Sequence, residues 1–207
     1  MVENHGGSHN MQWFESPLGS YLLEHEYRYF DKVVANIFGY NAIQIGLPQF
    51  CFLRLNRMPL QFSVGLEKTQ PALIAAADFL PIQSNSIDLA IMPHTLEFSN
   101  NPHQILREVY RVLIPEGHIV ISGFNPLSLW GISRYLKANR AEYPWNGNFI
   151  ALLRLKDWLK LLDFETMGGQ LCCYAPPFEQ EKWRKRLSFM EAAGDRWWPF
   201  LGSVYFV

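Results

Sequence analysis

The sequence predicts an α/β fold, with a mostly parallel sheet between helices on both faces. Apolar runs of strand length alternate along the chain with longer amphipathic segments of helical period. Residues 87–123 show this best, because an amphipathic helix lies there between two apolar runs. Strands that are separated by helices form right-handed β–α–β units and lie parallel in one sheet.

Short apolar runs, rich in β-branched residues, mark the expected strands. Five of them fall in the first 123 residues: Asn41–Gly46, Leu60–Leu66, Leu73–Ala77, Ile87–Met92 and His118–Gly123. A later strand is expected to start at Phe164. The closing run Gly202–Val207 (GSVYFV) is expected to form the last one.

Helices are expected in three stretches. Apolar residues recur at helical spacing over residues 17–37, which predicts one long or two short helices. The best marked helix follows Asn101, which can cap it, and Pro102 fits its first turn because no N–H is needed there. Pro115 and Gly117 are expected to end it. A third amphipathic helix is expected over Leu153–Leu162.

The length of 207 residues fits one domain with a core of its own. Residues 1–12, rich in Gly, His and Asn, are expected to form a flexible N-terminal tail. Residues 13–207 are expected to form a single domain, with a Pro-rich and Trp-rich insertion around 176–199.

Composition excludes several classes of function. The formal net charge of −1 gives no reason to expect a nucleic-acid partner, and no apolar run approaches the roughly 18 residues of a membrane span. The first residues lack the basic and apolar regions of a signal peptide, and three cysteines fit no disulfide or zinc pattern. We therefore expect a cytoplasmic protein. One basic cluster, residues 181–186, is either a contact surface around Trp183 or a solvated helix face.

Polar and glycine residues follow the strands at the place where such sheets bind ligands. Open α/β sheets bind beyond the carboxyl ends of their strands, where the strand order reverses. Five positions fall at these ends: Gly46, Glu67, Asp78, His94 and Asn125. The sequence therefore predicts one crevice on which these positions converge.

The segment Ile74–Pro126 resembles the small-molecule branch of the class I S-adenosylmethionine (SAM)-dependent methyltransferases, of the type 11 kind. The likeness rests on Asp-Phe-Leu-Pro at residues 78–81, followed by a strand, a Pro-started helix and a second strand. The run Gly-Phe-Asn-Pro-Leu-Ser-Leu-Trp-Gly (123–131), with the opening Trp13…Pro17-Leu18-Gly19, is similar to a bacterial methyltransferase subgroup with a reduced glycine loop. The resemblance implies a Rossmann-like sheet whose last strand, GSVYFV, is antiparallel.

The resemblance also implies a cofactor, S-adenosyl-L-methionine, and the residues that hold it. Asp78 would bind the adenine amino group, and the N–H of Phe79 would reach a ring nitrogen. Glu67, 21 residues after Gly46, would accept both ribose hydroxyls, and Gly46 would let the backbone approach the cofactor. The alternatives are a capping role for Asp78, a surface Glu67 and an ordinary turn at Gly46.

The glycine loop departs from the family pattern. Methyltransferases of this kind have an acidic residue and several glycines here, as in E/D-x-G-x-G-x-G, whereas this chain has Gln44-Ile-Gly-Leu-Pro48. The 32 residues from Gly46 to Asp78 are also few for two helices and two strands of mean length, about 11 and 5 residues each. At least one of the two helices is expected to be shortened or missing.

His94 and Asn125 are the candidate catalytic residues. An unperturbed histidine titrates near neutral pH and can accept a proton from a nucleophile. The alternative for His94 is a structural residue at a strand end. The apolar loop with Phe124 and Trp130, around Asn125, is either a wall for an apolar acceptor or packs beneath the insertion.

These features predict a SAM-dependent methyltransferase that acts on a small or lipophilic acceptor without a metal ion. Methyl transfer from a sulfonium needs alignment and desolvation rather than an invariant catalytic residue, so the main evidence against it is the weakened glycine loop. The alternative is a binding or regulatory protein of the same fold that has lost or weakened SAM binding. A short dehydrogenase is disfavoured because its dinucleotide loop is missing.

Overall fold

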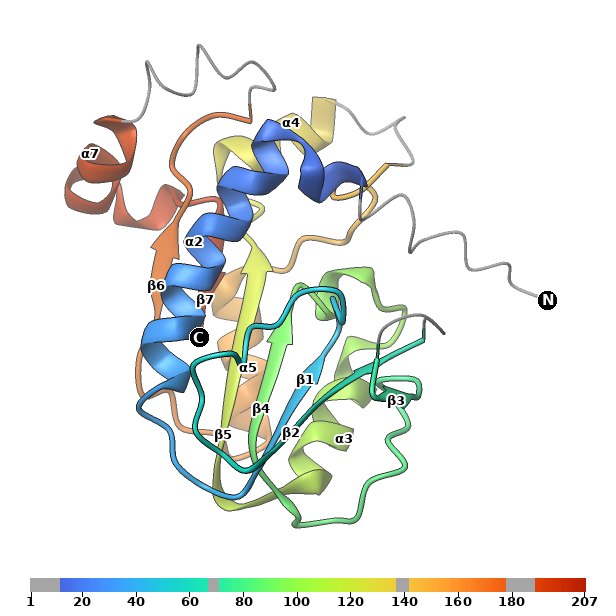
Figure 1. Cartoon of the computed structure of the whole chain (residues 1–207). Coiled ribbons are helices and arrows are strands. Elements are labelled where there is room, and N and C mark those ends of the chain that lie inside the picture. The colour runs from blue at the N-terminus through green and yellow to red at the C-terminus, as the bar shows by residue number, and fades with distance from the viewer. Residues whose placement is uncertain (1–11, 67–70, 137–141, 178–188) are drawn as a thin grey trace.

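The computed structural model describes residues 12–66, 71–136, 142–177 and 189–207, which form the expected α/β sheet (Figure 1). The strands are β1 (Asn41–Ile45), β2 (Leu60–Gly65), β3 (Leu73–Ile74), β4 (Ile87–Pro93), β5 (Leu113–Phe124), β6 (Gln170–Cys172) and β7 (Val204–Phe206). The helices are α2 (Pro17–Val34), α3 (Pro102–Val112), α4 (Leu129–Leu136), α5 (Leu152–Leu161) and α7 (Phe189–Trp197), with the 3₁₀ turns η1 (Leu96–Phe98) and η2 (Pro199–Leu201).

Strand pairing confirms the predicted Rossmann-like sheet. The strand order is β3-β2-β1-β4-β5-β7-β6. β1 is parallel to both of its neighbours, β2 and β4, and β5 continues the parallel order beside β4. β7 is antiparallel to β5 and β6, as expected for the last strand. The order reverses at β1, so the ligand crevice of such a sheet lies at the carboxyl ends of β1 and its neighbours.

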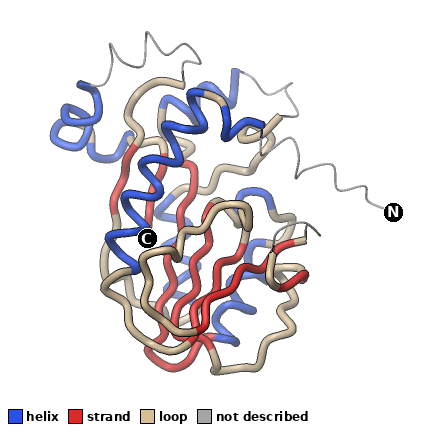
Figure 2. The backbone as a smooth tube through the Cα atoms, in the orientation of Figure 1, coloured by secondary structure: helices blue, strands red, loops and turns tan. Residues whose placement is uncertain are grey.

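Helices cover both faces of the sheet (Figure 2). α2 packs on one face, where its residues Leu22 and Phe30 share a core with Leu89 of β4. α3 and α5 pack on the other face, where Ile105 and Leu155 share a core with strand residues such as Ala90. Neighbouring residues of a strand point to opposite faces, so β1, β4, β5 and β7 contribute to both cores.

The connections from β1 to β2 and from β3 to β4 are loops. Residues 46–59, between β1 and β2, contain turns and no helix, and residues 75–86, between β3 and β4, do so as well. The sequence leaves too little room for two helices between Gly46 and Asp78. The first of them, expected between β1 and β2, is missing. Phe52 and Leu53 of the first loop are buried against the core on the α2 side, and the loop crosses that face (Figure 1). This loop replaces a helix as cover for the sheet.

The starts of two strands differ most from the sequence expectation. β5 starts at Leu113, directly after α3, so Pro115 and Gly117 lie inside the strand. Glu116 has a φ of 64°, a local irregularity that a periodicity pattern does not register. The strand expected from Phe164 begins only at Gln170, because Asp163 ends α5 in the left-handed region (φ 61°) and a loop follows.

Some expectations fall outside the described residues. These are residues 1–11 of the tail expected over residues 1–12, the proposed ribose ligand Glu67 and the basic cluster 181–186. The domain limits 13–207 and the insertion at 176–199 stay predictions. Within the part of the chain that the structure describes, no helix is both long enough and apolar enough to cross a membrane.

Candidate functional site

The candidate residues that the structure describes lie just beyond the ends of parallel strands. Gly46 follows β1, His94 follows β4 and Asn125 follows β5, while Asp78 and Phe79 lie in the turn after β3. Parallel strands end at the same edge of the sheet, so these residues share the edge where such folds bind ligands. Their side chains differ in accessibility, because His94 and Asn125 are buried whereas Asp78 and Phe79 are exposed.

Gly46 brings the end of β1 against the end of β4. Its φ of 89° lies in the left-handed region, and a Cβ at this position would lie 2.6 Å from Oγ1 of Thr95. The Thr95 hydroxyl donates a 2.6 Å hydrogen bond to the carbonyl of Ile45. Both the backbone conformation and Thr95 therefore exclude a side chain at Gly46.

Gln44 occupies the position of the family's acidic residue, and its side-chain amide forms hydrogen bonds with the backbone of the loop after β1. The residue is 3% exposed. Its amide nitrogen donates to the carbonyls of Gly46, Leu47 and Phe50, at 3.2, 3.0 and 2.7 Å. Its Oε1 accepts a 3.0 Å hydrogen bond from the N–H of Phe52. An ionised carboxylate has no hydrogen to donate, so an acidic residue could not hold these three carbonyls.

Pro48 packs against the end of β2. A Cβ built on Gly65, the last residue of β2, would lie 3.1 Å from Cγ of Pro48. In Rossmann-type sites the ribose lies near the end of this strand, within reach of an acidic residue. Pro48 therefore narrows the space beside β2 in which the ribose of a cofactor would lie.

The turn after β3 presents an open carboxylate and an open aromatic ring. Phe79 is 77% exposed, and the Asp78 carboxylate has no hydrogen bond or ion pair with any described residue. Glu108 of α3 anchors the turn by accepting a 3.1 Å hydrogen bond from the N–H of Leu80. The N–H of Phe79 already donates to the carbonyl of Ala76 at 3.1 Å, so an adenine nitrogen would have to displace that bond.

His94 lies between two buried carboxylates. Its side chain is fully buried, with Nε2 2.9 Å from Oε1 of Glu26 and Nδ1 3.0 Å from Oε1 of Glu97. The Ser122 hydroxyl donates to Glu26 and the N–H of Phe124 donates to Glu97, both at 2.8 Å. The imidazole also stacks on the Phe124 ring, 4.0 Å away. The network ties α2 to the carboxyl ends of β4 and β5.

The two carboxylates keep His94 charged. Burial alone would lower the pKa of an imidazole, but the adjacent carboxylates of Glu26 and Glu97 raise the pKa of His94 from 6.5 to about 10. A protonated imidazole has no free nitrogen with which to accept a proton. The geometry therefore favours the structural alternative over a general base. The sequence signal for Glu26 is its place on the apolar stripe of α2, between Leu22 and Phe30.

Asn125 holds two parts of the chain together. Its amide nitrogen donates to the carbonyls of Phe200 and Gly202, at 3.0 and 2.9 Å. Its Oδ1 accepts a 3.1 Å hydrogen bond from the N–H of Leu127. The side chain thus joins the loop after β5 to the segment before β7, and both of its amide hydrogens are used inside the fold.

The apolar loop after β5 packs inward. Phe124 and Trp130 are fully buried, and Nε1 of Trp130 donates a 3.0 Å hydrogen bond to the carbonyl of Ala175. Phe149 stacks on Phe124 with ring centres 4.8 Å apart. Phe149 is the more exposed ring of this stack, so it is the ring that reaches the cavity beyond the strand ends.

A cavity of about 560 Å³ opens over the carboxyl ends of β4 and β5, and we call it the acceptor cavity. Leu96, after β4, and Pro126, after β5, form part of its wall, and Phe149 and Ile150, before α5, form another part. Small-molecule sites in proteins are concave, mostly apolar and about 300–1,000 Å³ in volume. The volume of the acceptor cavity lies in this range, and its wall combines apolar residues with polar ones such as Ser99, Asn100 and Asn148.

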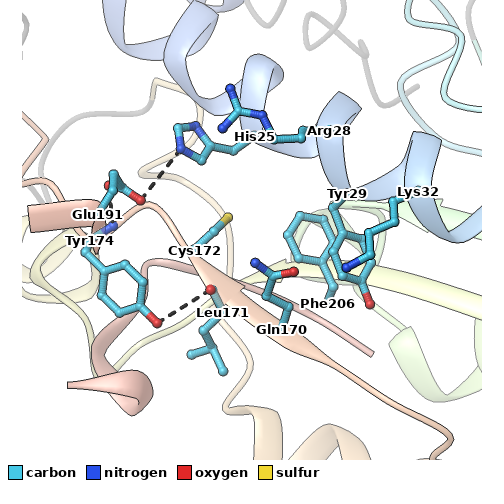
Figure 3. A pocket seen from close by; sticks show the side chains of 10 residues that line it. All are labelled: His25, Arg28, Tyr29, Lys32, Gln170, Leu171, Cys172, Tyr174, Glu191 and Phe206. Carbon is cyan, nitrogen blue, oxygen red and sulfur yellow. Dashed lines mark hydrogen bonds and ion pairs between the residues drawn. The ribbon is translucent and has the colours of Figure 1, made fainter. Parts of the chain in front are cut away.

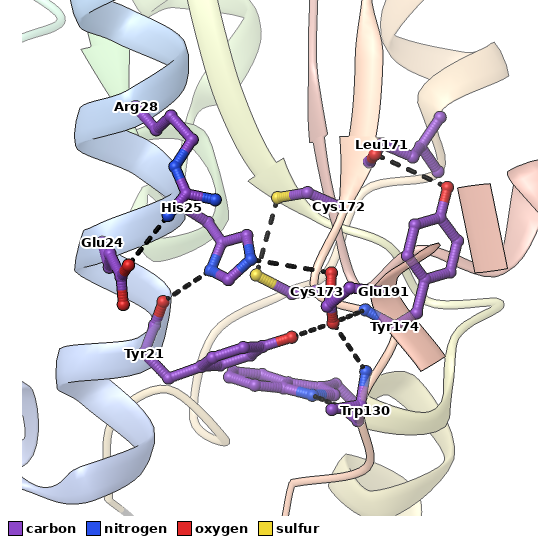
Figure 4. Close-up of polar contacts among 11 residues, drawn as sticks. Tyr21, Glu24, His25, Arg28, Trp130, Leu171, Cys172, Cys173, Tyr174 and Glu191 are labelled. Carbon is purple, nitrogen blue, oxygen red and sulfur yellow. Dashed lines mark hydrogen bonds and ion pairs between the residues drawn. The ribbon is translucent and has the colours of Figure 1, made fainter. Parts of the chain in front are cut away.

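A second cavity of about 290 Å³ lies at the other side of the sheet, between α2 and the edge strand β6 (Figure 3). His25, Arg28 and Lys32 of α2 border it at helical spacing. Glu191 of α7 lies 3.6 Å from His25 and accepts a 2.9 Å hydrogen bond from the N–H of Tyr174 (Figure 4). None of the residues that line this cavity comes from the strand ends of the candidate crevice.

Comparison with known sequences points to one family. The profile of the family described as "Methyltransferase domain" matches residues 57–121. "Uncharacterized protein YafS" of Escherichia coli K12 is 30% identical over 174 residues, which cover 84% of this chain and 70% of YafS. "Uncharacterized protein MJ1123" of Methanocaldococcus jannaschii is 27% identical over 95 residues, which cover 46% of each chain.

Solved structures share the fold. A SAM-dependent methyltransferase from Thermotoga maritima has a TM-score of 0.71 and 17% identity, covering 96% of this chain and 92% of its own. Another from Archaeoglobus fulgidus has a TM-score of 0.62 and 15% identity, covering 89% of this chain and 91% of its own. The family match, the relative and the sheet order agree, and the chain belongs to the class I SAM-dependent methyltransferases.

Proposed function

We propose that the chain transfers a methyl group from SAM to a small acceptor with an apolar surface, bound in the acceptor cavity. The observation that carries the proposal is the position of this cavity, at the carboxyl ends of β4 and β5 and next to the reversal of strand order. Ligands of open α/β sheets bind at this place. The volume of the cavity and its apolar residues Leu96, Phe149 and Ile150 suit a small molecule with an apolar surface.

The nucleoside end of SAM fits the turn after β3. The open carboxylate of Asp78 can accept a hydrogen bond from the adenine amino group, and the exposed Phe79 ring can lie against the base. Glu67 stays our candidate for the ribose hydroxyls, although it lies outside the described residues. A hydrogen bond to a charged group contributes about 1.5–3 kcal/mol, so two such carboxylates support measurable binding.

The amino-acid end of SAM has fewer partners. Gln44 draws the loop carbonyls inward, and Pro48 occupies space beside β2. Gly46 is the one glycine left of the family's loop pattern. We therefore expect weak cofactor binding, with a dissociation constant of roughly tens of micromolar or more, equivalent to about −6 kcal/mol.

The residues of the chain contribute alignment rather than proton transfer. Bound SAM supplies a methyl group on an electrophilic sulfonium, so the protein needs mainly to position and desolvate the acceptor. We assign His94 and Asn125 to this positioning. His94 fixes the ends of β4 and β5 below the acceptor cavity, and Asn125 fixes the loop that follows β5.

Titration calorimetry with S-adenosylhomocysteine (SAH), the demethylated cofactor, tests the proposal without an acceptor. We expect the wild type to bind, and Asp78→Asn to weaken binding about fivefold or more, because the neutral amide oxygen is a weaker acceptor than the carboxylate, by about 1 kcal/mol or more. Asp157→Asn on the exposed face of α5 is the matched control and should bind like the wild type. No heat at millimolar SAH, or affinity that ignores Asp78→Asn, would contradict the proposal.

A binding or regulatory protein that has lost SAM is the second candidate. The loop after β1 favours it, because Gln44 and Pro48 shape that loop without leaving the family's glycines for a cofactor. A chain that binds ligands in the acceptor cavity but shows no heat with SAH would support this candidate.

A further inference from the structure

The acceptor cavity has basic side chains in its wall and no acidic ones. Arg154 and His103 line it, and none of its lining residues is Asp or Glu. The guanidinium of Arg154 lies 5.4 Å from the ring centre of Trp158, and the His103 ring lies 4.0 Å from the same ring. Arg154 forms no ion pair with a described carboxylate. The positive charge at this wall is therefore not neutralised by a neighbouring residue of the described chain.

Two helices begin at the same wall. Pro102 and His103 of the first turn of α3 line the cavity, and so do Ala151 and Arg154 at the start of α5. Ala151 has no side chain that could cap α5, and the Asn101 side chain makes no capping bond to α3. Helix N-termini carry a partial positive charge and free N–H donors, which add to the field of Arg154.

Polar Ser99, Asn100 and Asn148 also line the cavity, and the rest of its wall is apolar. Leu96, Pro126 and Phe149 belong to it. Phe149 stacks on Phe124, and Phe124 stacks on the buried His94, so the Phe149 ring rests on the network at the strand ends. The Arg134 guanidinium lies over the Phe149 ring, 5.3 Å from its centre. A flat apolar group in the cavity would therefore lie against Leu96, Pro126 and the accessible part of Phe149, while its polar end reached the basic wall.

We propose that the acceptor cavity binds a flat apolar molecule with one anionic group, a carboxylate or a phosphate monoester. Arg154 and the N-terminus of α5 hold the anion, because a guanidinium binds the oxygens of both groups in bidentate fashion. As a description of the methyl acceptor this rests on the proposed function; as a binding property of the cavity it stands alone.

Three probes with one ring system test the proposal. The full chain is titrated by calorimetry with 2-naphthoate, with 2-naphthyl phosphate and with neutral 2-naphthamide. We expect both anions to bind about tenfold or more tightly than the amide, since each gains a charged hydrogen bond that the amide lacks. The tighter of the two anions then identifies the carboxylate or the phosphate as the better fit.

The variant Arg154→Gln tests whether the preference for anionic probes arises in the acceptor cavity. This variant should lose about tenfold or more in affinity for both anions and keep its affinity for the amide. Lys160→Gln, which removes the same charge from the far end of α5 outside the cavity, should behave like the wild type. Phe149→Ala should weaken all three probes, because it removes apolar contact that they share.

Two results would overturn the proposal: equal or undetectable binding of the three probes at millimolar concentration, or an anion preference that survives in Arg154→Gln. The outcome is separate from that of the proposed function. If the chain binds SAH but shows no preference for the anionic probes, only the anion-binding proposal is contradicted. If the chain binds the anions through Arg154 but does not bind SAH, only the proposed methyl transfer is contradicted.

Discussion

Replacing His94 by phenylalanine tests the buried network that joins α2 to the sheet. Phenylalanine can keep a ring on Phe124 but removes both nitrogens, so Glu26 and Glu97 lose a cation that lies 2.9 and 3.0 Å away. Breaking a buried ion pair leaves an uncompensated charge and costs about 3–5 kcal/mol. A domain has only about 5–15 kcal/mol of unfolding free energy, so His94→Phe should lose a large part of it.

The pH dependence follows from the direction of the pKa shift. The pKa of His94 is about 10 in the fold, against 6.5 for an unperturbed histidine. Since the folded value is the higher one, the stabilisation is complete below pH 6.5 and is lost as the pH rises toward 10. The loss approaches about 1.4 kcal/mol per pH unit within this window. His94→Phe lacks the group and should lose less stability over the same window.

Urea unfolding, followed by circular dichroism at about pH 7 and about pH 9.5, measures both effects as free energies. His118→Phe is the control, because His118 is a partly buried histidine of β5 with no ion pair to a described residue. It should keep the pH dependence of the wild type. The reasoning is refuted if His94→Phe stays within about 1 kcal/mol of the wild type at both pH values.

Three further substitutions test the loop after β1. Gln44→Glu replaces a buried donor to three carbonyls by a carboxylate. It should lower the unfolding free energy by about 3 kcal/mol or more. An unchanged urea midpoint would contradict the role of the amide. Gly46→Ala should lower the unfolding free energy by about 1–3 kcal/mol, because the residue has a φ of 89°. The loss should be smaller in a Thr95→Ala background, where the nearest side-chain atom is absent. Equal losses in thermal unfolding would show that Thr95 plays no part. Pro48→Ala should tighten SAH binding in calorimetry, because the ring narrows the space beside β2; weaker binding would mean that Pro48 supports the cofactor.

The sheet core could be predicted because its signals are local. The run Ile87–Met92 became β4 with one more residue, and Pro102 starts α3 as its position indicated. Apolar periodicity reports which side of an element is buried, and strands joined by helices have few other ways to pair. The antiparallel last strand came from the family resemblance rather than from any local pattern.

The positions of the candidate residues could be predicted, but their partners could not. Strand ends are visible in the sequence, so Gly46 and His94 were placed at the correct edge. Glu26 is 68 positions away from His94 and meets it only because α2 packs across the sheet. The role of Gln44 depends on the path of a loop that no periodicity describes. Contacts of this kind belong to the tertiary fold and not to a motif.

The basic wall of the acceptor cavity had a partial signal. Ala151 before an amphipathic helix indicates an N-terminus without a side-chain cap, which leaves its N–H donors free. No local sequence pattern indicates that Arg154 and His103 line the same cavity. Their proximity depends on the packing of α3 and α5 on one face of the sheet.

A crystal structure of the chain with SAH tests the proposed function most directly. We expect the adenine amino group within hydrogen-bond distance of the Asp78 carboxylate, and the sulfur beyond Gly46 on the side of the acceptor cavity. SAH that leaves Asp78 without a contact, or a crevice that stays empty at saturating SAH, would contradict a SAM-dependent methyl transfer at this site.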